Sequence, residues 1–349
     1  MHVPDGFINA PVSAVTGVVA AGAIAVSLRG ARRELDERTA PLAGLVAAFI
    51  FAVQMLNFPV AAGTSGHLLG GALAAILVGP FTGVLCVSVV LLMQGILFAD
   101  GGLTALGVNI TDMAIVTTVV SYAFFRGLVK VLPRKRRSVT VASFVAALLS
   151  VPAAALAFTF LYAIGGTTDV AISKVATAMI GVHVLIGVGE AAITALTVGA
   201  VIAVRPDLVY GARGLQQRLK LRVNGELVDA PTAAAPVAAR SSHRKLWITG
   251  LVTSLVLAGF VSFYASASPD GLEKVAKDKG IDARTGKHAT EDSPLAGYGV
   301  KDVSDPRVSG GLAGVIGVGV TVVAGTGVFW TVRRRRTSDS SPVSVPEGV

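Results

Sequence analysis

Long apolar runs, separated by short polar or basic segments, dominate this sequence. A run of about 20 apolar residues can cross a bilayer as a helix. The third run is short and rich in glycine, which is typical of a short or tilted helix or of part of a re-entrant element. We therefore expect an all-α polytopic membrane protein. The pattern predicts nine segments, at 9–28, 41–60, 67–80, 82–98, 104–125, 140–163, 175–204, 246–265 and 309–332.

Clusters of Lys and Arg follow the first, fifth, seventh and ninth segments. Such clusters mark the cytoplasmic side of a membrane protein. With all four inside, the N-terminus lies outside and the C-terminus is cytoplasmic. The loops near 63–66, 100–102, 165–169 and 266–308 are then outside. The clusters consist of Arg29, Arg32, Arg33 and Arg38; Arg126, Lys130, Arg134, Lys135, Arg136 and Arg137; Arg213, Arg218, Lys220 and Arg222; and Arg333, Arg334, Arg335 and Arg336.

The chain divides into two membrane units joined by a linker. The segment 206–244 begins basic and continues into an Ala/Pro-rich run at 230–236, and such a composition is typical of a tether. We expect a seven-helix unit at 1–205, a cytoplasmic linker at 206–244 and a two-helix accessory unit at 245–336. The accessory unit carries an extracytoplasmic loop at 266–308, and the tail at 337–349 is expected to be disordered.

Composition excludes several classes of protein. Hydrophobic residues make up 53% and charged residues 15% of the chain, whereas soluble domains carry about 25% charged residues. The net charge of +9 lies in short clusters between apolar runs without aromatic platforms, so it indicates membrane orientation and lipid contact, not nucleic acid. The single cysteine, Cys86, allows neither an internal disulfide nor a thiolate metal cluster.

The first two residues carry the most specific chemistry. The α-amine of Met1, the backbone nitrogen of His2 and a ring nitrogen of His2 can all bind one cation. This nitrogen-rich, roughly planar set suits Ni(II), Cu(II) or Co(II) better than Mg(II) or Ca(II), provided that the terminus is neither cleaved nor blocked. The turn signal at Pro4-Asp5-Gly6 could fold the terminus back toward the membrane. Taken alone, His2 is better interpreted as an ordinary terminal residue.

His67 is the candidate fourth nitrogen donor. It lies in the sequence GTSGHLLGG at 63–71, on the same predicted side of the membrane as His2. The glycines allow tight turns and a close approach of the backbone. A helix cap or an interfacial histidine is an equally good interpretation of this position.

Further polar residues lie in or near the apolar segments. His183 and Glu190 are seven residues apart, which places them on one face of a helix, where they could form an ion path or an interhelical hydrogen bond. Metal-bound histidines usually need acceptors that fix their tautomer, although hydrogen bonding between helices is an alternative for each residue. The candidates for such a supporting or ion-path role are Ser65, Asn57, Gln94, Asn109, Asp112, His183 and Glu190.

Two enzymatic signatures are missing from the sequence. It contains no G-x-x-x-x-G-K-[ST] phosphate loop, so we do not expect this chain to hydrolyse ATP. It contains no H-E-x-x-H motif, so an intramembrane zinc protease has no support.

Two histidine motifs together, MHVPDGF at 1–7 and GTSGHLLG at 63–70, closely resemble the CbiM/NikM family. This family is the substrate-binding component of energy-coupling factor cobalt/nickel transporters. The similarity covers about residues 1–205 and includes NFP at 57–59, Gln94-Gly95, Asn109 and the stretch 183–190. The second unit, with SPDGLE at 268–273 and SPLAGY at 293–298, resembles the PDGLE domain, a NikN-like accessory subunit.

The resemblance implies high-affinity uptake of cobalt or nickel across the plasma membrane of a prokaryote. It implies that Met1, His2 and His67 hold the ion, which is the transported substrate, without a tightly bound organic cofactor. A transmembrane coupling subunit and a pair of cytosolic ABC ATPases would supply the energy. Two alternatives stay open: a membrane-embedded metalloenzyme, for which Glu190 is the only candidate base, and a metal channel or sensor without ATP coupling. The choice between cobalt and nickel also stays open.

Overall fold

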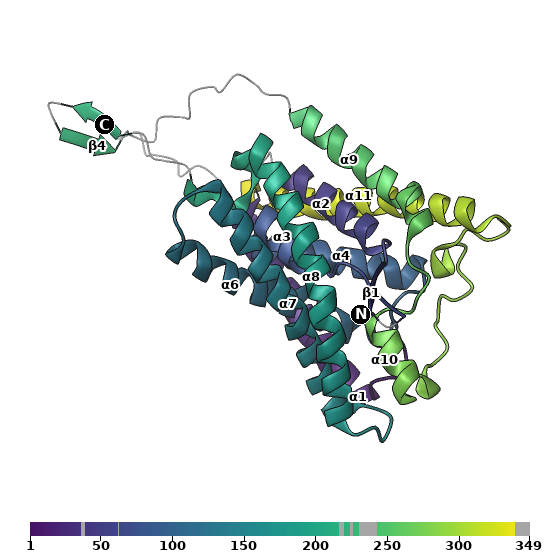
Figure 1. The fold of residues 1–349 in the computed structure, drawn as a ribbon. Coiled ribbons are helices and arrows are strands. Elements are labelled where there is room, and N and C mark those ends of the chain that lie inside the picture. Colours follow the sequence, from purple (N-terminus) through teal and green to yellow (C-terminus); the bar gives the residue numbers. More distant parts are fainter. Residues whose placement is uncertain (36–38, 62, 216–219, 224–225, 230–242, 339–349) are drawn as a thin grey trace, which may run out of the picture.

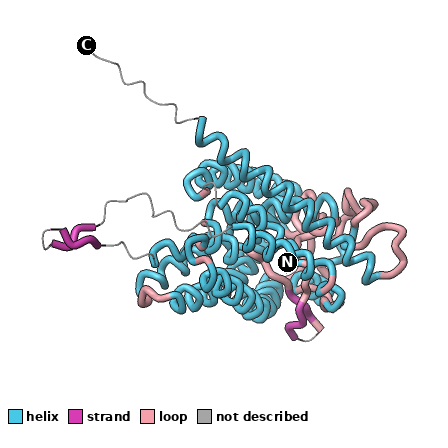
Figure 2. The backbone as a smooth tube through the Cα atoms, turned by 90° about the horizontal axis from the view of Figure 1, so that it is seen from above, coloured by secondary structure: helices cyan, strands magenta, loops and turns pink. Residues whose placement is uncertain are grey.

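A computed structural model describes residues 1–35, 39–61, 63–215, 220–223, 226–229 and 243–338 (Figure 1). The predicted Ala/Pro-rich run at 230–236 and nearly all of the predicted tail lie outside these residues. The described chain is predominantly helical, in agreement with the predicted all-α class. Most of its longer connecting loops lie toward one end of the bundle, which we call the loop end (Figure 2).

The first unit is a bundle of helices built from the predicted apolar runs. The helix α7 packs along α8, and α6 packs against α7 (Figure 1). Polar side chains inside this unit bond mostly to backbone carbonyls of their own helices, as the Thr159 hydroxyl does to Ala155. The helices are α1 (Ala10–Glu34), α2 (Thr39–Gln54), α3 (Gly71–Val78), α4 (Pro80–Leu97), α5 (Leu106–Asn109), the π-helix η1 (Ile110–Val116), α6 (Thr117–Val131), α7 (Arg136–Gly165) and α8 (Ile172–Val204).

The short helix α3 forms the centre of the first unit. All eight of its residues are buried, and it contacts α2, α4, α6, α7 and α8. A helix that is apolar on every side is stable only when it is enclosed. Glycines in positive-φ conformations bound it, with Gly70 at φ +90° and Gly79 at φ +103°. A two-stranded hairpin, β1 (Phe58–Ala61) with β2 (Thr64–Gly66), leads into it, so α3 fixes the loop that contains His67.

The prediction of nine membrane-crossing segments is not met in full. Seven helices of the described residues are long and apolar enough to cross a membrane. The segment expected at 67–80 is α3, which at about 12 Å is too short to cross a bilayer. The segment expected at 41–60 ends as a helix at Gln54 and continues as the hairpin. A hydropathy window cannot separate a buried core helix from a short crossing helix, which explains the difference.

The second unit consists of two long helices and a folded loop. The helices α9 (His243–Gly259) and α11 (Pro306–Ser338) pack against each other and against α2 of the first unit. Between them the chain forms the 3-10 turn η4 (Val261–Tyr264), the helix α10 (Gly271–Lys279) and the 3-10 turns η5 (Asp282–Arg284) and η6 (Ala296–Tyr298). This segment between α9 and α11 crosses the loop end of the bundle. There α10 contacts α8 and β2, beside the N-terminus (Figure 1).

Between the two units the chain forms two 3-10 turns, η2 (Pro206–Leu208) and η3 (Tyr210–Leu215). A short antiparallel ribbon follows, made of β3 (Lys220–Val223) and β4 (Glu226–Asp229). The sequence did not predict this ribbon, because the basic and Ala/Pro-rich composition of the whole segment is typical of a tether.

Small residues allow the two units to pack closely. A Cβ atom added at Gly44 of α2 would lie 2.9 Å from the backbone nitrogen of Thr326 in α11. Gly317 of α11 similarly faces the ring of Phe51, which is fully buried. Close backbone approach at small residues is the usual way in which membrane helices associate, because lipid gives them no hydrophobic drive to pair.

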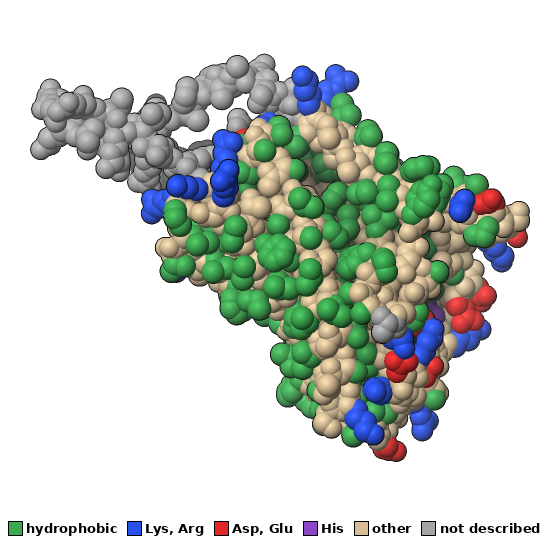
Figure 3. All heavy atoms as spheres, in the orientation of Figure 1, with side chains coloured by type: hydrophobic (Ala, Val, Ile, Leu, Met, Phe, Trp, Pro, Cys, Tyr) green, Lys and Arg blue, Asp and Glu red, His purple; other side chains and the backbone are tan. Residues whose placement is uncertain are grey.

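The surface of the bundle matches a membrane environment. Apolar side chains cover a broad belt around the helices (Figure 3). Lys and Arg gather at one end of this belt, whereas acidic and basic side chains are mixed at the loop end. With its seven long apolar helices, the chain is a multi-pass membrane protein.

We expect Gly317→Leu to destabilise the contact between the two units. The added side chain would have to displace Phe51, and overpacking of this kind costs about 1–3 kcal/mol. The thermal unfolding midpoint of the protein in detergent should therefore decrease. Gly319→Leu is the matched control, because nothing lies within 4 Å of a Cβ atom at that position on the same helix. Equal midpoints for the two variants would contradict this packing.

Candidate metal site at the N-terminus

The N-terminus is folded back into the loop end of the bundle and clamped there. Val3 is fully buried, and its backbone nitrogen donates to Oδ1 of Asn109 at 2.7 Å. The Asn109 amide donates to the carbonyl of Val3 at 3.1 Å, and so does the backbone nitrogen of Gly102 at 2.8 Å. One side chain thus binds both polar groups of Val3, which holds Met1 and His2 in place.

The α-amine of Met1 lies against the ring of His67. The distance from this nitrogen to Nε2 of His67 is 2.6 Å, and Met1 is only 3% exposed. Nδ1 of His67 lies 2.9 Å from the carbonyl of Leu68, which can only accept, so Nδ1 carries the proton. Nε2 therefore presents a lone pair toward the amine, which is the tautomer that a metal ligand requires.

Two side chains from helices of the first unit hold the His67 loop. The carboxylate of Glu190 in α8 accepts from the backbone nitrogens of Leu69 at 2.5 Å and Gly70 at 3.0 Å. The amide of Gln54 in α2 donates to the carbonyl of Leu69 at 3.0 Å. Glu190 thus lies at the amino end of α3, where backbone N–H groups favour an anion. In the structure it therefore binds the backbone of the loop that contains His67.

The His2 ring stacks on His67, with 5.1 Å between the ring centroids. Nε2 of His2 lies 3.1 Å from the side-chain oxygen Oε1 of Gln94, and Nδ1 of His2 lies 3.4 Å from a carboxylate oxygen of Asp100. Burial lowers the pKa of His2 to about 4, although the negative charge of Asp100 opposes this shift. The ring is therefore neutral at physiological pH and able to donate a lone pair.

Asp270 of the second unit reaches this cluster, and the sequence analysis gave it no role. Its Oδ2 lies 2.8 Å from the Met1 amine and 3.5 Å from Nε2 of His67. Burial raises the pKa of Asp270, but the positive Met1 amine and a hydrogen bond with His67 outweigh it and hold the pKa well below its usual range. His2, His67 and Asp270 each place one ligand atom within 4.8 Å of the others.

Backbone contacts dock the PDGLE sequence onto the His67 loop. Ser65 donates from its hydroxyl to the carbonyl of Ser268 at 2.7 Å and from its backbone nitrogen to that of Pro269 at 2.9 Å. The backbone nitrogen of Ser266 donates to the carbonyl of Asn57 at 2.7 Å. The predicted supporting residues Ser65 and Asn57 therefore hold the second unit instead of the histidine rings.

Two predicted residues lie apart from the cluster. Asp112 is buried in the π-helix η1, and neither of its carboxylate oxygens has a hydrogen-bond partner among the described residues. His183 is buried in α8, with Nδ1 bonded to the carbonyl of Met179 and its ring next to Gly271. His288, in the loop of the second unit, is half-buried, and its Nε2 lies 3.1 Å from the carbonyl of Gly101.

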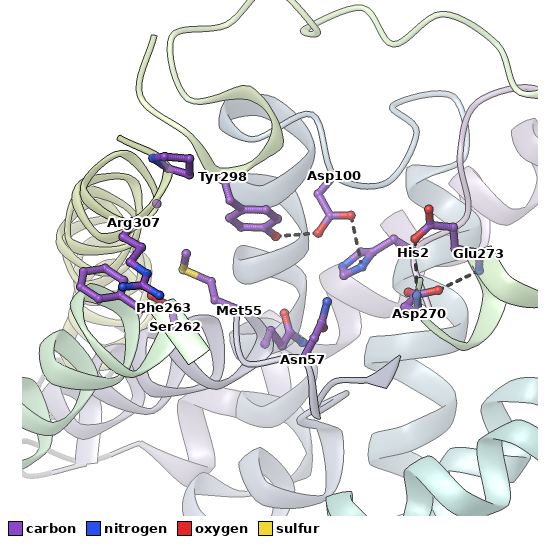
Figure 4. A pocket seen from close by; sticks show the side chains of 13 residues that line it. His2, Met55, Asn57, Asp100, Ser262, Phe263, Asp270, Glu273, Tyr298 and Arg307 are labelled. Atoms are coloured by element: carbon purple, nitrogen blue, oxygen red, sulfur yellow. Dashed lines mark hydrogen bonds and ion pairs between the residues drawn. The ribbon is translucent and has the colours of Figure 1, made fainter. Parts of the chain in front are cut away.

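A cavity of about 400 Å³ lies between the two units and leads to His2 (Figure 4). The ring of His2 and the carboxylates of Asp100 and Asp270 point toward one another at one end of this cavity, and Arg307 lies at the other end. The hydroxyl of Tyr298 donates to Asp100 at 2.6 Å, which ties the second unit to the loop at 100–102. The lining of the cavity includes three carboxylates, those of Asp100, Asp270 and Glu273.

Comparisons with known proteins agree with this architecture. The family described as the cobalt uptake substrate-specific transmembrane region matches residues 2–208, and the PDGLE domain matches 244–334. The cobalt transport protein CbiM of Sorangium cellulosum is 32% identical over 216 residues, which cover 60% of this chain and 94% of that protein. The fused nickel transport protein NikMN of Rhodobacter capsulatus is 42% identical over 125 residues, which cover 36% of each chain.

The fold has a relative of known structure as well. The crystal structure of a truncated transition metal transporter superposes with a TM-score of 0.51 and 27% sequence identity, over 58% of this chain and 99% of that one. A multi-pass helical protein with these relatives is a component of a metal-ion transporter and not an enzyme. The chain belongs to the CbiM family of cobalt and nickel uptake proteins, and it carries a PDGLE domain after the family region.

The lowered pKa of His2 predicts a pH-dependent stability of the metal-free protein. The His2 ring takes up a proton below about pH 6.5 in the unfolded chain but only below about 4 in the folded one. Unfolding therefore binds a proton between these values, and the free energy of unfolding decreases as the pH falls through this window, by about 3 kcal/mol at most. The thermal midpoint, measured between pH 7 and 4, should decrease less steeply for His2→Gln. Parallel curves for the two proteins would contradict the prediction.

Proposed function

We propose that this chain captures Ni(II) or Co(II) outside the cell and delivers it across the membrane as the substrate-binding component of an energy-coupling factor transporter. The observation that carries the proposal is the contact between the Met1 amine and Nε2 of His67, at 2.6 Å inside the loop end. Two nitrogens bound side by side to one ion, each at about 2.0–2.1 Å, lie about 2.9 Å apart. The apposition of these two groups supports a common role as ligands.

The proposed ligands are the Met1 amine, the backbone and ring nitrogens of His2, and Nε2 of His67. Binding requires the amine to be neutral and the His2 amide nitrogen to be deprotonated, so it releases protons and should weaken in acid. Nδ1 of His2 is the ring nitrogen that can close a small ring with the His2 backbone nitrogen. In this structure its neighbour is Asp100, so the ring must turn as the ion arrives.

The surrounding contacts support a pre-formed site. Asn109 binds both polar groups of Val3, Glu190 holds the backbone at Leu69 and Gly70, and Gln94 is the partner of the His2 ring. Groups that fix the orientation of ligands commonly change metal affinity by about 10–100-fold when they are lost. These residues support the ligands and do not bind the ion in this proposal.

The cavity between the units is the proposed route of the ion to the site. Its three carboxylates attract cations and raise their local concentration. The mixed charge at the loop end and the Lys and Arg at the opposite end support an extracytoplasmic loop end (Figure 3). Release into the cell then requires a rearrangement that breaks the chelate. A transmembrane coupling subunit and a pair of cytosolic ABC ATPases would drive it, since this sequence contains no phosphate-binding loop.

We expect two alanines added before Met1 to abolish tight binding of Ni(II) and Co(II). The addition moves the free amine by two residues and converts the Met1 nitrogen into an amide, and it avoids placing the histidine third from the amine, where it could form another planar chelate. We expect His67→Ala to have the same effect, because it removes the fourth nitrogen. Each affinity should decrease at least about tenfold, the lower end of the change seen when even a supporting group is lost.

Titration of the purified full chain with each ion measures this effect. A protein with two alanines added after Val349 is the matched control for the extension, and it should bind the ions like the unchanged protein. Retention of full affinity by both the extended protein and His67→Ala would exclude the terminal chelate.

A further inference from the structure

We propose that Asp270, in the second unit, is a fifth donor to the transported ion and contributes to the choice of metal. This inference rests on the proposed function, because it concerns the same site. It gives the PDGLE unit a chemical role within the site, beyond packing against it. The residue comes from a part of the chain that lies more than 200 positions from the histidine motifs.

The distances around the Met1 amine carry the proposal. Oδ2 of Asp270 lies 2.8 Å from this nitrogen, and Nε2 of His67 lies 2.6 Å from it. Both values are close to the spacing of about 2.9 Å expected for neighbouring donors on one ion. Oδ2 and Nε2 are 3.5 Å apart, so the three atoms form a compact triangle. Since four nitrogens already make up the proposed planar set, the oxygen would bind outside that plane.

The carboxylate is oriented by its own helix and not only by the ion pair with the amine. Oδ1 of Asp270 accepts from the backbone nitrogen of Glu273 at 2.8 Å and thus caps α10. This bond fixes the side chain and leaves Oδ2 directed at the cluster. The neighbouring Gly271 lies against α8, where an added Cβ atom would come within 2.7 Å of Ile186 and 3.0 Å of His183. A donor held in this way is already positioned before the ion arrives.

A fifth donor changes which ions the site prefers. Planar sets of nitrogens suit Cu(II) and Ni(II), and Cu(II) has the highest intrinsic affinity of the divalent series. Selection must therefore come from geometry. An oxygen outside the plane favours an ion that accepts five donors, such as Co(II), over one that is satisfied by four. We expect Asp270 to matter most for Co(II) and least for Cu(II).

The competing explanation is that Asp270 only neutralises the buried amine of the metal-free protein. In that case the carboxylate competes with the ion for the Met1 amine, and removing the carboxylate raises the affinity of the protein for the ion. The two explanations thus predict opposite signs for the same variant.

Asp270→Asn in the full chain, with its native Met1, separates them. Asn is about as good a helix N-cap as Asp, so α10 should stay folded in this variant. An unchanged thermal unfolding midpoint would verify this. The control is Asp278→Asn, which removes the same charge from the same helix at an exposed site paired with Lys274. Affinities for Co(II), Ni(II) and Cu(II) are measured by competition titration. X-ray absorption of the Co(II)-loaded proteins measures the number and type of donors.

The expected result for Asp270→Asn is a loss of Co(II) affinity of at least about tenfold, a smaller loss for Cu(II) and one oxygen fewer around the ion. Asp278→Asn should match the unchanged protein. Gly271→Val keeps the carboxylate but moves α10 away from α8, so it should reproduce the loss. Unchanged or higher Co(II) affinity with an unchanged donor set in Asp270→Asn would overturn the inference. The proposed function would survive that outcome as long as His67→Ala still abolished binding.

Discussion

A buried, free α-amine held against the unprotonated nitrogen of a histidine is the interaction on which the rest of the structure depends. A charged or polar group inside a protein is costly unless it is paired, and the Met1 amine is paired twice, with His67 and Asp270. The surrounding residues place the chain end in this position: Asn109 clamps Val3, and Glu190 fixes the loop of His67. The central helix α3 begins at Gly71, directly after that loop, and its buried position anchors the loop inside the bundle.

The two units form one site and not two adjacent ones. Backbone hydrogen bonds join Ser65 to Ser268 and Pro269, and Tyr298 bonds to Asp100 beside His2. The cavity that leads to His2 exists only between the units, since each contributes part of its lining (Figure 4). Glycines along α11 allow α2 and α11 to pack closely. This packing brings the two units together, with the folded loop lying over the N-terminus.

The sequence predicted the helical class, most of the long segments and the two histidine motifs, since long apolar runs and terminal chelating residues are local signals. The glycines of the third segment indicated a short helix or a re-entrant element, and the structure shows an eight-residue helix bounded by Gly70 and Gly79, but hydropathy alone could not show that it is enclosed by other helices. The sequence did not predict that Asp270 contacts the Met1 amine. The capping sequence around Asp270 was visible, but its contact with Met1 spans 269 positions and depends on how two units pack. Ser65 and Asn57 were predicted to support the histidines, whereas their hydrogen-bond partners in the structure are in the second unit.

The covalent link between the two units has a consequence for how the loop over the N-terminus behaves. In a complex of separate subunits, the fraction of molecules with this loop in place depends on the concentration of the second subunit in the membrane. Here the loop and the chain end belong to one molecule, so docking is intramolecular and is governed by an effective concentration that dilution does not change. The loop can therefore leave the site and return many times without the loss of its partner, and every copy of the protein is made with the two parts in equal number.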